Sequence, residues 1–281
     1  MSKICFLSTD DLSGYVSDDE LAVVPLGDLG YAAETLSWRQ TERPWNEFAA
    51  VVIRTPWDYQ RTPKEFLAVL AEITAHTRLE NPLDIIEWNL DKHYLSDMSE
   101  RGVDIVPTLW PTEYSRDSFA EWLSASESGE VVIKPTVSAT AENTFRLAEY
   151  DDALGSIFAS REFMVQPFVA SIVDEGEFSL FYFAGEYSHA IVKRPKTGDF
   201  RVQEEHGGII TAIRPDAGLR AACDSVVRAI GKTLLYARVD LVKFNGRYAL
   251  MELELIEPSL YLRMDTEAPR RFAAAVDKFL G

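Results

Sequence analysis

Three carboxylates near the C-terminal end of the chain are placed so that they can hold a metal ion. They lie in RVDLVKFNGRYALMELELIE, residues 238–257, which reads as two apolar strands joined by Asn-Gly, a strong β-hairpin signal. Glu252 and Glu254 are two apart and point to one face of a strand, and Asp240 on the partner strand can share that face. Buried carboxylates are costly unless a cation faces them. The pattern therefore predicts either a site for one or two hard cations or a solvated acidic face.

Positively charged residues gather at a few places in a chain whose net charge is −17. Lys134 ends the apolar run EVVIKP, and Lys92 stands where a helix is expected to start. The loop KRPKTGDFR adds Lys193, Arg194 and Arg201. Singly, each is typical of a solvated surface charge. Together with an acidic metal site, these cations fit a magnesium–nucleotide complex, because Lys and Arg bind phosphate oxygens.

Strands and helices must bring these charges together. The first part of the chain alternates apolar strands, such as KICFLST and FAAVVIRT, with the helical pattern FLAVLAEITAH, which predicts a parallel α/β sheet. Later segments, such as GEFSLFYFAGEYSHAIVKRP, predict antiparallel hairpins. We expect an N-terminal Rossmann-like α/β domain over residues 1–88, a central α+β subdomain over 89–164 and a C-terminal subdomain with the acids over 165–281. Asn89 or Asp91 is the expected N-cap of a helix.

The composition argues against several classes of function. A chain of 281 residues with net charge −17 lacks the basic field of a general nucleic-acid or membrane-surface binder. No apolar run reaches membrane-spanning length, and the first residues read as a strand rather than a signal peptide. Cys5 and Cys223 lack metal-type spacing, so we expect reduced thiols in a cytoplasmic protein.

The order of the motifs resembles that of the ATP-grasp superfamily, most closely its ribosomal-protein-glutamate-ligase and glutathione-synthetase-like branch. The resemblance covers about residues 85–265. LDKHYLSDMSERGVDIVPT is similar to the segment that opens the fold and implies a phosphate-contacting lysine at Lys92. VVIKP implies a second one at Lys134. FMVQPFV resembles the hinge whose backbone binds adenine, which here contains Gln166, Phe168 and Val169.

Three further segments fit the same family. EGEFSLFYFAGEYSHAIVKRP resembles the following hairpin and implies that Glu177 holds the ribose hydroxyls. GDFRVQEEHGG is similar to the loop over the triphosphate and acceptor, with Arg201 at the family's arginine. RVDLV and LMELELIEP match the metal strands. The resemblance therefore implies magnesium ligands at Asp240, Glu252 and Glu254.

Two features depart from the family pattern. The loop after Lys134 reads PTVSATAENT and lacks the usual glycines, so either it closes less tightly over phosphate or Ser138 and Thr140 donate hydroxyl groups instead. Glu254 stands where the family often has asparagine, which adds negative charge to the metal site.

The resemblance implies an ATP-grasp fold of α/β and α+β type, preceded by a Rossmann-like domain. The implied enzyme is an ATP-dependent, ADP-forming carboxylate–amine ligase with ATP and two magnesium ions. A carboxylate becomes an acylphosphate, and an amine-type nitrogen of the same or a second molecule displaces phosphate. Arg201 would be catalytic, with Lys193 and Arg194 beside it. The glycine-containing loop 194–210 is expected to be a mobile lid.

A small amino-acid-like substrate is implied by RTPWDY, which also resembles the branch with the cycloserine-forming O-ureido-serine cyclo-ligase and so indicates antibiotic biosynthesis. Arg54, Trp57 and Asp58 would face the cleft and bind the carboxylate and ammonium groups of the substrate. The alternative is that these residues form a surface loop. Arg263 is a second candidate for the carboxylate.

Other functions stay open at this point. A small-molecule phosphotransferase or a nucleotide-binding protein without catalysis can share the fold, although the intact lysines and acids argue against the latter. Cyclisation, ligation of two substrates and a homodimer also remain open. His189 on a strand is expected to be structural, whereas His206, before Gly-Gly in the loop, can carry protons.

Overall fold

The N-terminal part of the chain forms a parallel sheet covered on both faces. The computed structural model describes residues 1–40, 42–139 and 141–281. The sheet has the order β2-β1-β3-β4 and is built from β1 (Ser2–Ser8), β2 (Tyr31–Ser37), β3 (Ala50–Thr55) and β4 (Arg78–Glu80). On one face, Cys5 and Leu7 pack against α2 (Pro63–His76) and α3 (Leu83–Leu90). On the other, Ile4 and Phe6 pack against α1 (Val23–Asp28) and α9 (Ala268–Leu280). Burial on both faces explains the continuous apolar strands.

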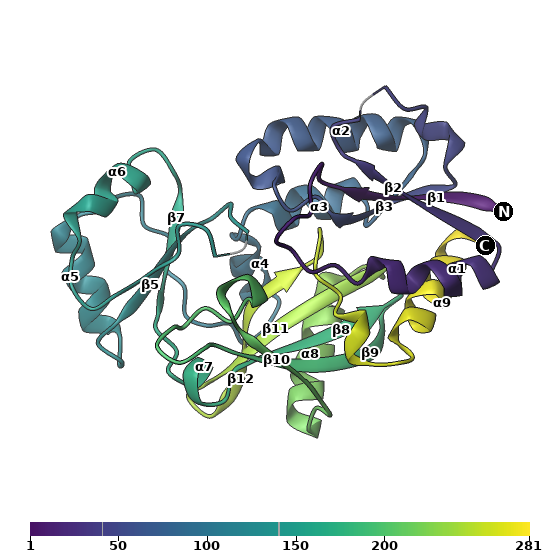
Figure 1. Ribbon diagram of the computed structural model, residues 1–281. Helices are drawn as coiled ribbons and strands as arrows, with labels where there is room; N and C mark the ends of the chain where they lie inside the picture. Colours follow the sequence, from purple (N-terminus) through teal and green to yellow (C-terminus); the bar gives the residue numbers. More distant parts are fainter. Residues whose placement is uncertain (41, 140) are drawn as a thin grey trace.

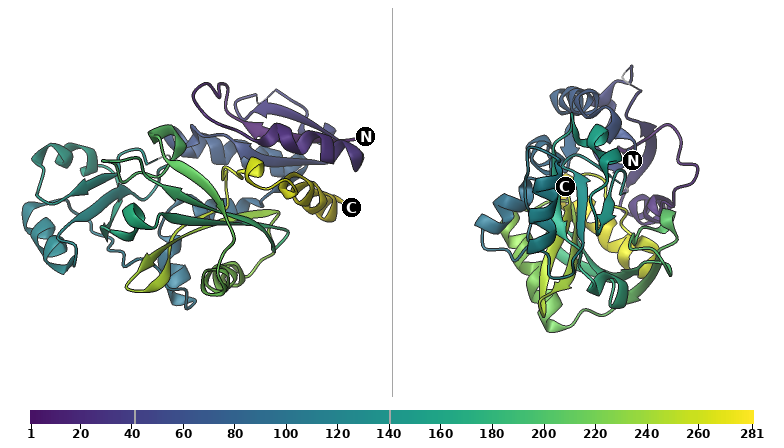
Figure 2. Two further views of the ribbon diagram at one scale, coloured as in Figure 1. Left: turned by 60° about the horizontal axis from the view of Figure 1, so that its bottom comes forward. Right: turned by 90° about the vertical axis from the view of Figure 1, so that its left-hand side faces the viewer.

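A small antiparallel sheet with the order β6-β5-β7 forms the far end of the molecule (Figure 1). Its strands are β5 (Val131–Pro135), β6 (Phe145–Leu147) and β7 (Phe163–Pro167). Aromatic residues of α5 (Arg116–Ala125) and α6 (Gly155–Phe158) fill its core. The chain termini lie side by side at the opposite end of the molecule (Figure 2).

The largest sheet lies between these two parts and has the order β10-β9-β8-β11-β12. Its strands are β8 (Glu177–Phe183), β9 (Glu186–Arg194), β10 (Ile209–Ile213), β11 (Tyr236–Phe244) and β12 (Arg247–Glu254). The predicted hairpins are present. Asn245 and Gly246 join β11 to β12 with φ values of 48° and 76°, a left-handed region that these two residues tolerate.

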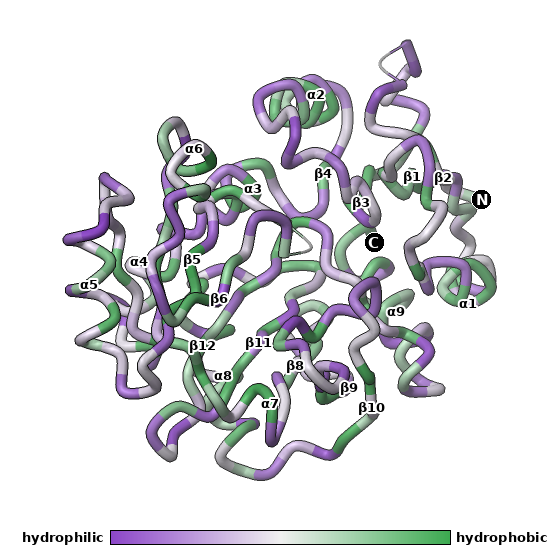
Figure 3. The backbone as a smooth tube through the Cα atoms, turned by 60° about the vertical axis from the view of Figure 1, so that its left-hand side comes forward, coloured by the Kyte–Doolittle hydropathy of each residue, from purple (hydrophilic) through white to green (hydrophobic). Residues whose placement is uncertain are grey.

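Helices α4 (Tyr94–Glu100) and α8 (Ala217–Ile230) cover one face of this sheet. Val239 and Leu253 point to them, so the neighbouring residues of β11 and β12 point to the other face. Apolar residues lie mostly in the strands and polar residues mostly in the connecting loops (Figure 3). Within the described residues, no helix is long and apolar enough to cross a membrane. The short α7 (Ser171–Asp174) follows β7.

The chain around Lys92 differs from the expected helix start. α3 ends at Leu90 and α4 begins at Tyr94, so Lys92 lies between two helices. The expected caps are wrong. Asn89 instead donates to the carbonyl of Leu253 at 2.9 Å and accepts from the Leu255 amide at 2.9 Å. It thereby ties α3 to the edge of the large sheet.

Beyond β12, residues 255–260 form an irregular stretch that we call the anchored segment. Each of its six carbonyl groups accepts a hydrogen bond from a side chain, which satisfies these buried backbone acceptors. In order, from Leu255 to Leu260, the side chains and distances to the carbonyl oxygens are Asn81 (2.7 Å), Tyr236 (2.8 Å), Trp57 (2.9 Å), Arg54 (3.1 Å), Arg238 (3.4 Å) and His189 (3.0 Å). Side chains of the N-terminal part and of the large sheet together thus fix the path of the chain after the acidic strand.

We expect Asn81→Ala to destabilise the protein by about 3 kcal/mol or more, since each buried backbone group left unsatisfied costs about 1–3 kcal/mol. Asn81 is 0% exposed, donates to the carbonyls of Tyr236 and Leu255 and accepts from the Leu235 amide. Urea unfolding measures the change. Asp84→Ala is the control, because it removes only an exposed ion pair with Lys232 across the same contact. Equal losses of unfolding free energy in both variants would contradict this role of Asn81.

Candidate active site

One face of the β11–β12 hairpin carries opposite charges in an ordered pattern. Asp240 lies opposite Glu252, and Arg238 lies opposite Glu254. Cross-strand partners share a face, so these four side chains point the same way. One carboxylate oxygen from each of the three acids lies within 4.8 Å of the others. The common face expected for the acids is present, and their donor set of carboxylate oxygens fits a hard cation such as Mg²⁺.

Four cations face four buried or half-buried carboxylates at this place. The Lys92 ammonium is 3.0 Å from Glu252. The Lys193 ammonium is 2.6 Å from Glu177 and 3.3 Å from Asp240. Arg238 lies 2.9 Å from Asp240 and also contacts Glu254. Lys134 is the fourth cation, attracted by Glu252. The pairing explains how so many charges can be buried together.

The cations decide how the acids ionise. Burial opposes ionisation of Asp240, but Arg238 and Lys193 outweigh it and lower the pKa of Asp240 to about 2. Burial also opposes ionisation of Glu252, yet Lys92 and Lys134 lower its pKa. For Glu254, burial wins over the attraction of Arg238, and its pKa rises to about 7. A further positive charge at this face would therefore be bound favourably.

A single cavity brings most of the predicted site residues together. Its lining includes Lys92, Lys134, Ser138, Gln166, Phe168, Val169, Glu177, Lys193, Arg201, Asp240, Glu252, Glu254 and Trp57. The β7 strand, which carries the predicted hinge, pairs directly with the β5 strand, and Lys134 lies opposite Met164. Lys92 also donates to the Ser138 carbonyl at 2.9 Å, which links the two lysine segments. Thr140, a predicted hydroxyl donor, lies outside the described residues.

Two residues that were predicted to bind the nucleotide have contacts that the sequence did not indicate. Glu177 is paired to Lys193 and so turns toward the acids. The Gln166 side chain donates to the Thr108 hydroxyl at 3.0 Å. Burial lowers the pKa of Lys134, helped by the neighbouring Lys92. A bound anion such as phosphate would offset that cost.

Four predicted residues lie outside the cavity, and the expectation that Arg54 and Asp58 face the cleft is wrong. Arg54 is 1% exposed and binds Asp19 at 3.0 Å and the Pro258 carbonyl. Asp58 pairs with Arg39 at 2.6 Å. The other two are Arg263, which pairs with Asp18 and Glu204, and Arg194, which is exposed at the end of β9. Their partners are distant in the sequence, so local patterns could not reveal these pairs.

The sequence interpretation missed several residues of the cavity. Arg238 precedes Asp240 by two positions, so strand periodicity alone puts both on one face and could have found it. Tyr15, Tyr59 and Glu257 also line the cavity, and they come from loops or from a three-residue 3-10 helix, which carry no periodic signal.

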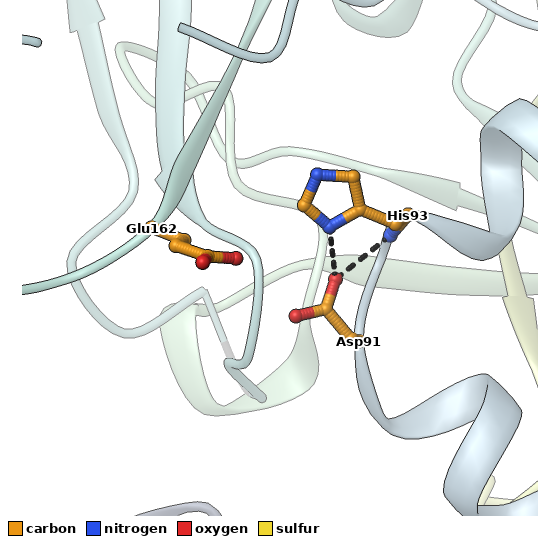
Figure 4. Close-up of side chains that lie close together, drawn as sticks. All are labelled: Asp91, His93 and Glu162. Carbon is orange, nitrogen blue, oxygen red and sulfur yellow. Dashed lines mark hydrogen bonds and ion pairs between the residues drawn. The ribbon is translucent and has the colours of Figure 1, made fainter. Parts of the chain in front are cut away.

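Asp91, His93 and Glu162 form a second group, beside the link between α3 and α4 (Figure 4). Asp91 accepts hydrogen bonds from the His93 backbone and lies 2.6 Å from the His93 ring. Its other oxygen accepts from the Thr136 hydroxyl at 2.9 Å. These contacts brace the chain that carries Lys92 against the β5 strand.

Comparisons with known proteins identify relatives of the chain as a whole. The cycloserine biosynthesis protein DcsG of Streptomyces lavendulae is 32% identical over 268 residues, which cover 88% of this chain and 89% of that protein. Residues 4–81 match the family model of the D-cycloserine synthetase DcsG N-terminal domain. The crystal structure of D-cycloserine synthetase DcsG has a TM-score of 0.85 at 29% identity and covers 100% of both chains.

The chain belongs to the DcsG family of ATP-grasp ligases. The ATP-grasp ligase PsnB, solved with a phosphomimetic variant of its minimal precursor, Mg and ADP, shares the fold. Its TM-score is 0.69 at 14% identity, over 99% of this chain and 98% of PsnB. The predicted fold class is confirmed. The chain is therefore a member of the DcsG family with the fold of the ATP-grasp ligases.

We expect Glu252→Gln to abolish ATP turnover without unfolding the protein. The carboxamide can still accept a hydrogen bond from Lys92, but it binds hard cations poorly and carries no charge. Turnover is measured as phosphate release, Mg²⁺ binding by calorimetry and folding by circular dichroism. Glu186→Gln, an exposed residue at the start of β9, is the control. Near-normal turnover or Mg²⁺ affinity in Glu252→Gln would show that this acid is not a metal ligand.

Proposed function

We propose that this enzyme activates the carboxylate of a small amino acid of the O-ureido-serine type and closes it into a cycloserine-like ring. The observation that supports this most is that one cavity combines the acids and lysines suited to a magnesium nucleotide with aromatic residues of the N-terminal part. The likeness to a cycloserine biosynthesis protein over almost the whole chain supports the ring-closing outcome.

In this proposal Lys92 and Lys134 bind the phosphates, the backbone of 166–169 binds adenine and Glu177 the ribose. Asp240, Glu252 and Glu254 hold Mg²⁺, which when bound neutralises phosphate charge. A carboxylate oxygen of the substrate attacks the γ-phosphorus and ADP leaves. The side-chain nitrogen then attacks the carbonyl carbon, loses its proton and expels phosphate. Arg238 and Arg201 stabilise the negative charge that develops in these steps.

The setting of the enzyme is part of the proposal. Cys5 and Cys223 are buried free thiols, as is usual in a reducing cytoplasm, and burial raises the pKa of Cys5 to about 12.

Incubation with ATP, Mg²⁺ and O-ureido-serine tests the function. We expect release of ADP and phosphate with this single compound and a ring product detected by mass spectrometry. Hydroxylamine should trap the activated carboxylate as a hydroxamate. Amino acids, alone and in pairs, are the comparison. If turnover needs two compounds, the enzyme ligates two substrates and does not cyclise one. A stable phosphorylated product without hydroxamate would identify a phosphotransferase.

Arg201→Ala is expected to lower kcat by about 100-fold or more and to change the KM for ATP by less than about 3-fold, because a contact that matters as charge develops lowers kcat. Arg201 lines the cavity and is held by Asp199 at 2.9 Å, in the loop 194–210. Lys196→Ala, an exposed residue of the same loop, is the control. Loss of ATP affinity with unchanged kcat would instead make Arg201 a ground-state contact.

The same loop is expected to close over bound ligands. Limited proteolysis within residues 194–210 should slow when a non-hydrolysable ATP analogue and substrate are both present. Unchanged cleavage would argue against a closing lid.

A further inference from the structure

Glu257 is a carboxylate of the cavity that has no cation of its own. It belongs to the anchored segment and follows Glu254 by three positions. Among the described parts of the chain, no Lys, Arg or His nitrogen lies within 4.0 Å of its oxygens. Of the other five acids that line the cavity, Glu177, Asp240, Glu252 and Glu254 each have such a partner, and Glu205 belongs to the loop 194–210 instead of the acidic strands.

The surroundings of Glu257 are aromatic. The Tyr59 hydroxyl interacts with its carboxylate, and the Trp57 indole donates to its carbonyl at 2.9 Å. The Tyr15 ring lies 5.3 Å from the Trp57 ring, between centroids, and all three aromatic residues line the cavity. Aromatic faces attract cations, and a carboxylate supplies the opposite charge. This combination suits a small organic cation.

Ionisation of Glu257 is unfavourable in the free protein, which also favours a bound organic cation at this place. Burial and the repulsion of Glu254 raise the pKa of Glu257 to about 8. Lys92 attracts it only from a distance, since the Lys92 ammonium is bound to Glu252 and to the Ser138 carbonyl. Among the described residues, Glu257 is also not part of the acid cluster that suits a metal ion. A cation brought by the substrate would supply the missing partner.

We propose that Glu257 binds the α-ammonium group of the amino-acid substrate, in a subsite lined by Tyr15, Trp57 and Tyr59. This rests on the proposed function. The ammonium and carboxylate groups of an α-amino acid share one carbon atom, so a carboxylate held near the metal acids places the ammonium a few Å away. Three residues span at most about 10 Å, so Glu257 is within reach of that point.

The subsite also decides which nitrogen reacts. An α-nitrogen held as ammonium by Glu257 has no lone pair and cannot attack the activated carboxylate. The ring must therefore close through the nitrogen of the side chain, and the α-amino group is retained in the product.

Kinetics of Glu257→Gln with O-ureido-serine and with its analogue lacking the α-amino group test the subsite. We expect the KM for O-ureido-serine to rise about 10- to 100-fold, as for loss of a charge-assisted hydrogen bond, and Glu257→Asp to recover part of it. The KM for ATP should change by less than about 3-fold. The analogue should react equally with wild type and Glu257→Gln. Glu267→Gln, an exposed residue outside the cavity, is the matched control. Equal losses with both compounds would overturn the assignment.

A second measurement separates this inference from the proposed function. Wild type and Glu257→Gln, each loaded with Mg²⁺ and a non-hydrolysable ATP analogue, are titrated with serine and with 3-hydroxypropanoate in a calorimeter. A preference for serine that disappears in Glu257→Gln supports the subsite, even if O-ureido-serine is not turned over and cyclisation is wrong. No serine binding, or no preference for serine, overturns the subsite even if cyclisation is right.

Discussion

Charge balance on one face of the β11–β12 hairpin is the constraint on which the site depends. Four carboxylates can be buried there only because Lys92, Lys134, Lys193 and Arg238 reach the same place from four different strands or links. Since removing one member would leave an uncompensated buried charge, the positions of these elements depend on each other. The break between α3 and α4 follows from this requirement, because it lets Lys92 turn toward Glu252.

The second requirement is that the carbonyl groups of the segment after β12 have hydrogen-bond donors. β12 is the last strand of its sheet, and in the part of the chain that the structure describes, no strand pairs with the segment beyond Glu254. Side chains from the N-terminal sheet and from β9 and β11 bind these groups instead. The buried Arg54 is thus a positioning residue for the anchored segment. Glu257 owes its place in the cavity to this arrangement.

Features with a local pattern could be predicted from the sequence. The hairpins, the parallel N-terminal sheet and the common face of the three acids followed from strand periodicity and from turn residues. The roles expected for Arg54, Asp58 and Arg263 rested on charge and nearness to a strand end. Their actual partners, Asp19, Arg39 and Asp18, are set by tertiary packing. Glu257 was out of reach for the same reason, because the segment around it is irregular and is ordered by distant side chains.

The six held carbonyls of the anchored segment also bear on how such enzymes can diverge. Three of the donors, Arg54, Trp57 and Asn81, come from the N-terminal part, and they bind the backbone rather than side chains of the segment. Backbone acceptors are present whatever residues occupy 255–260, so point changes there can alter substrate preference while the attachment persists. Exchange of the whole N-terminal part by recombination would remove three donors at once. The attachment therefore tolerates point changes within the segment better than exchange of the whole N-terminal part.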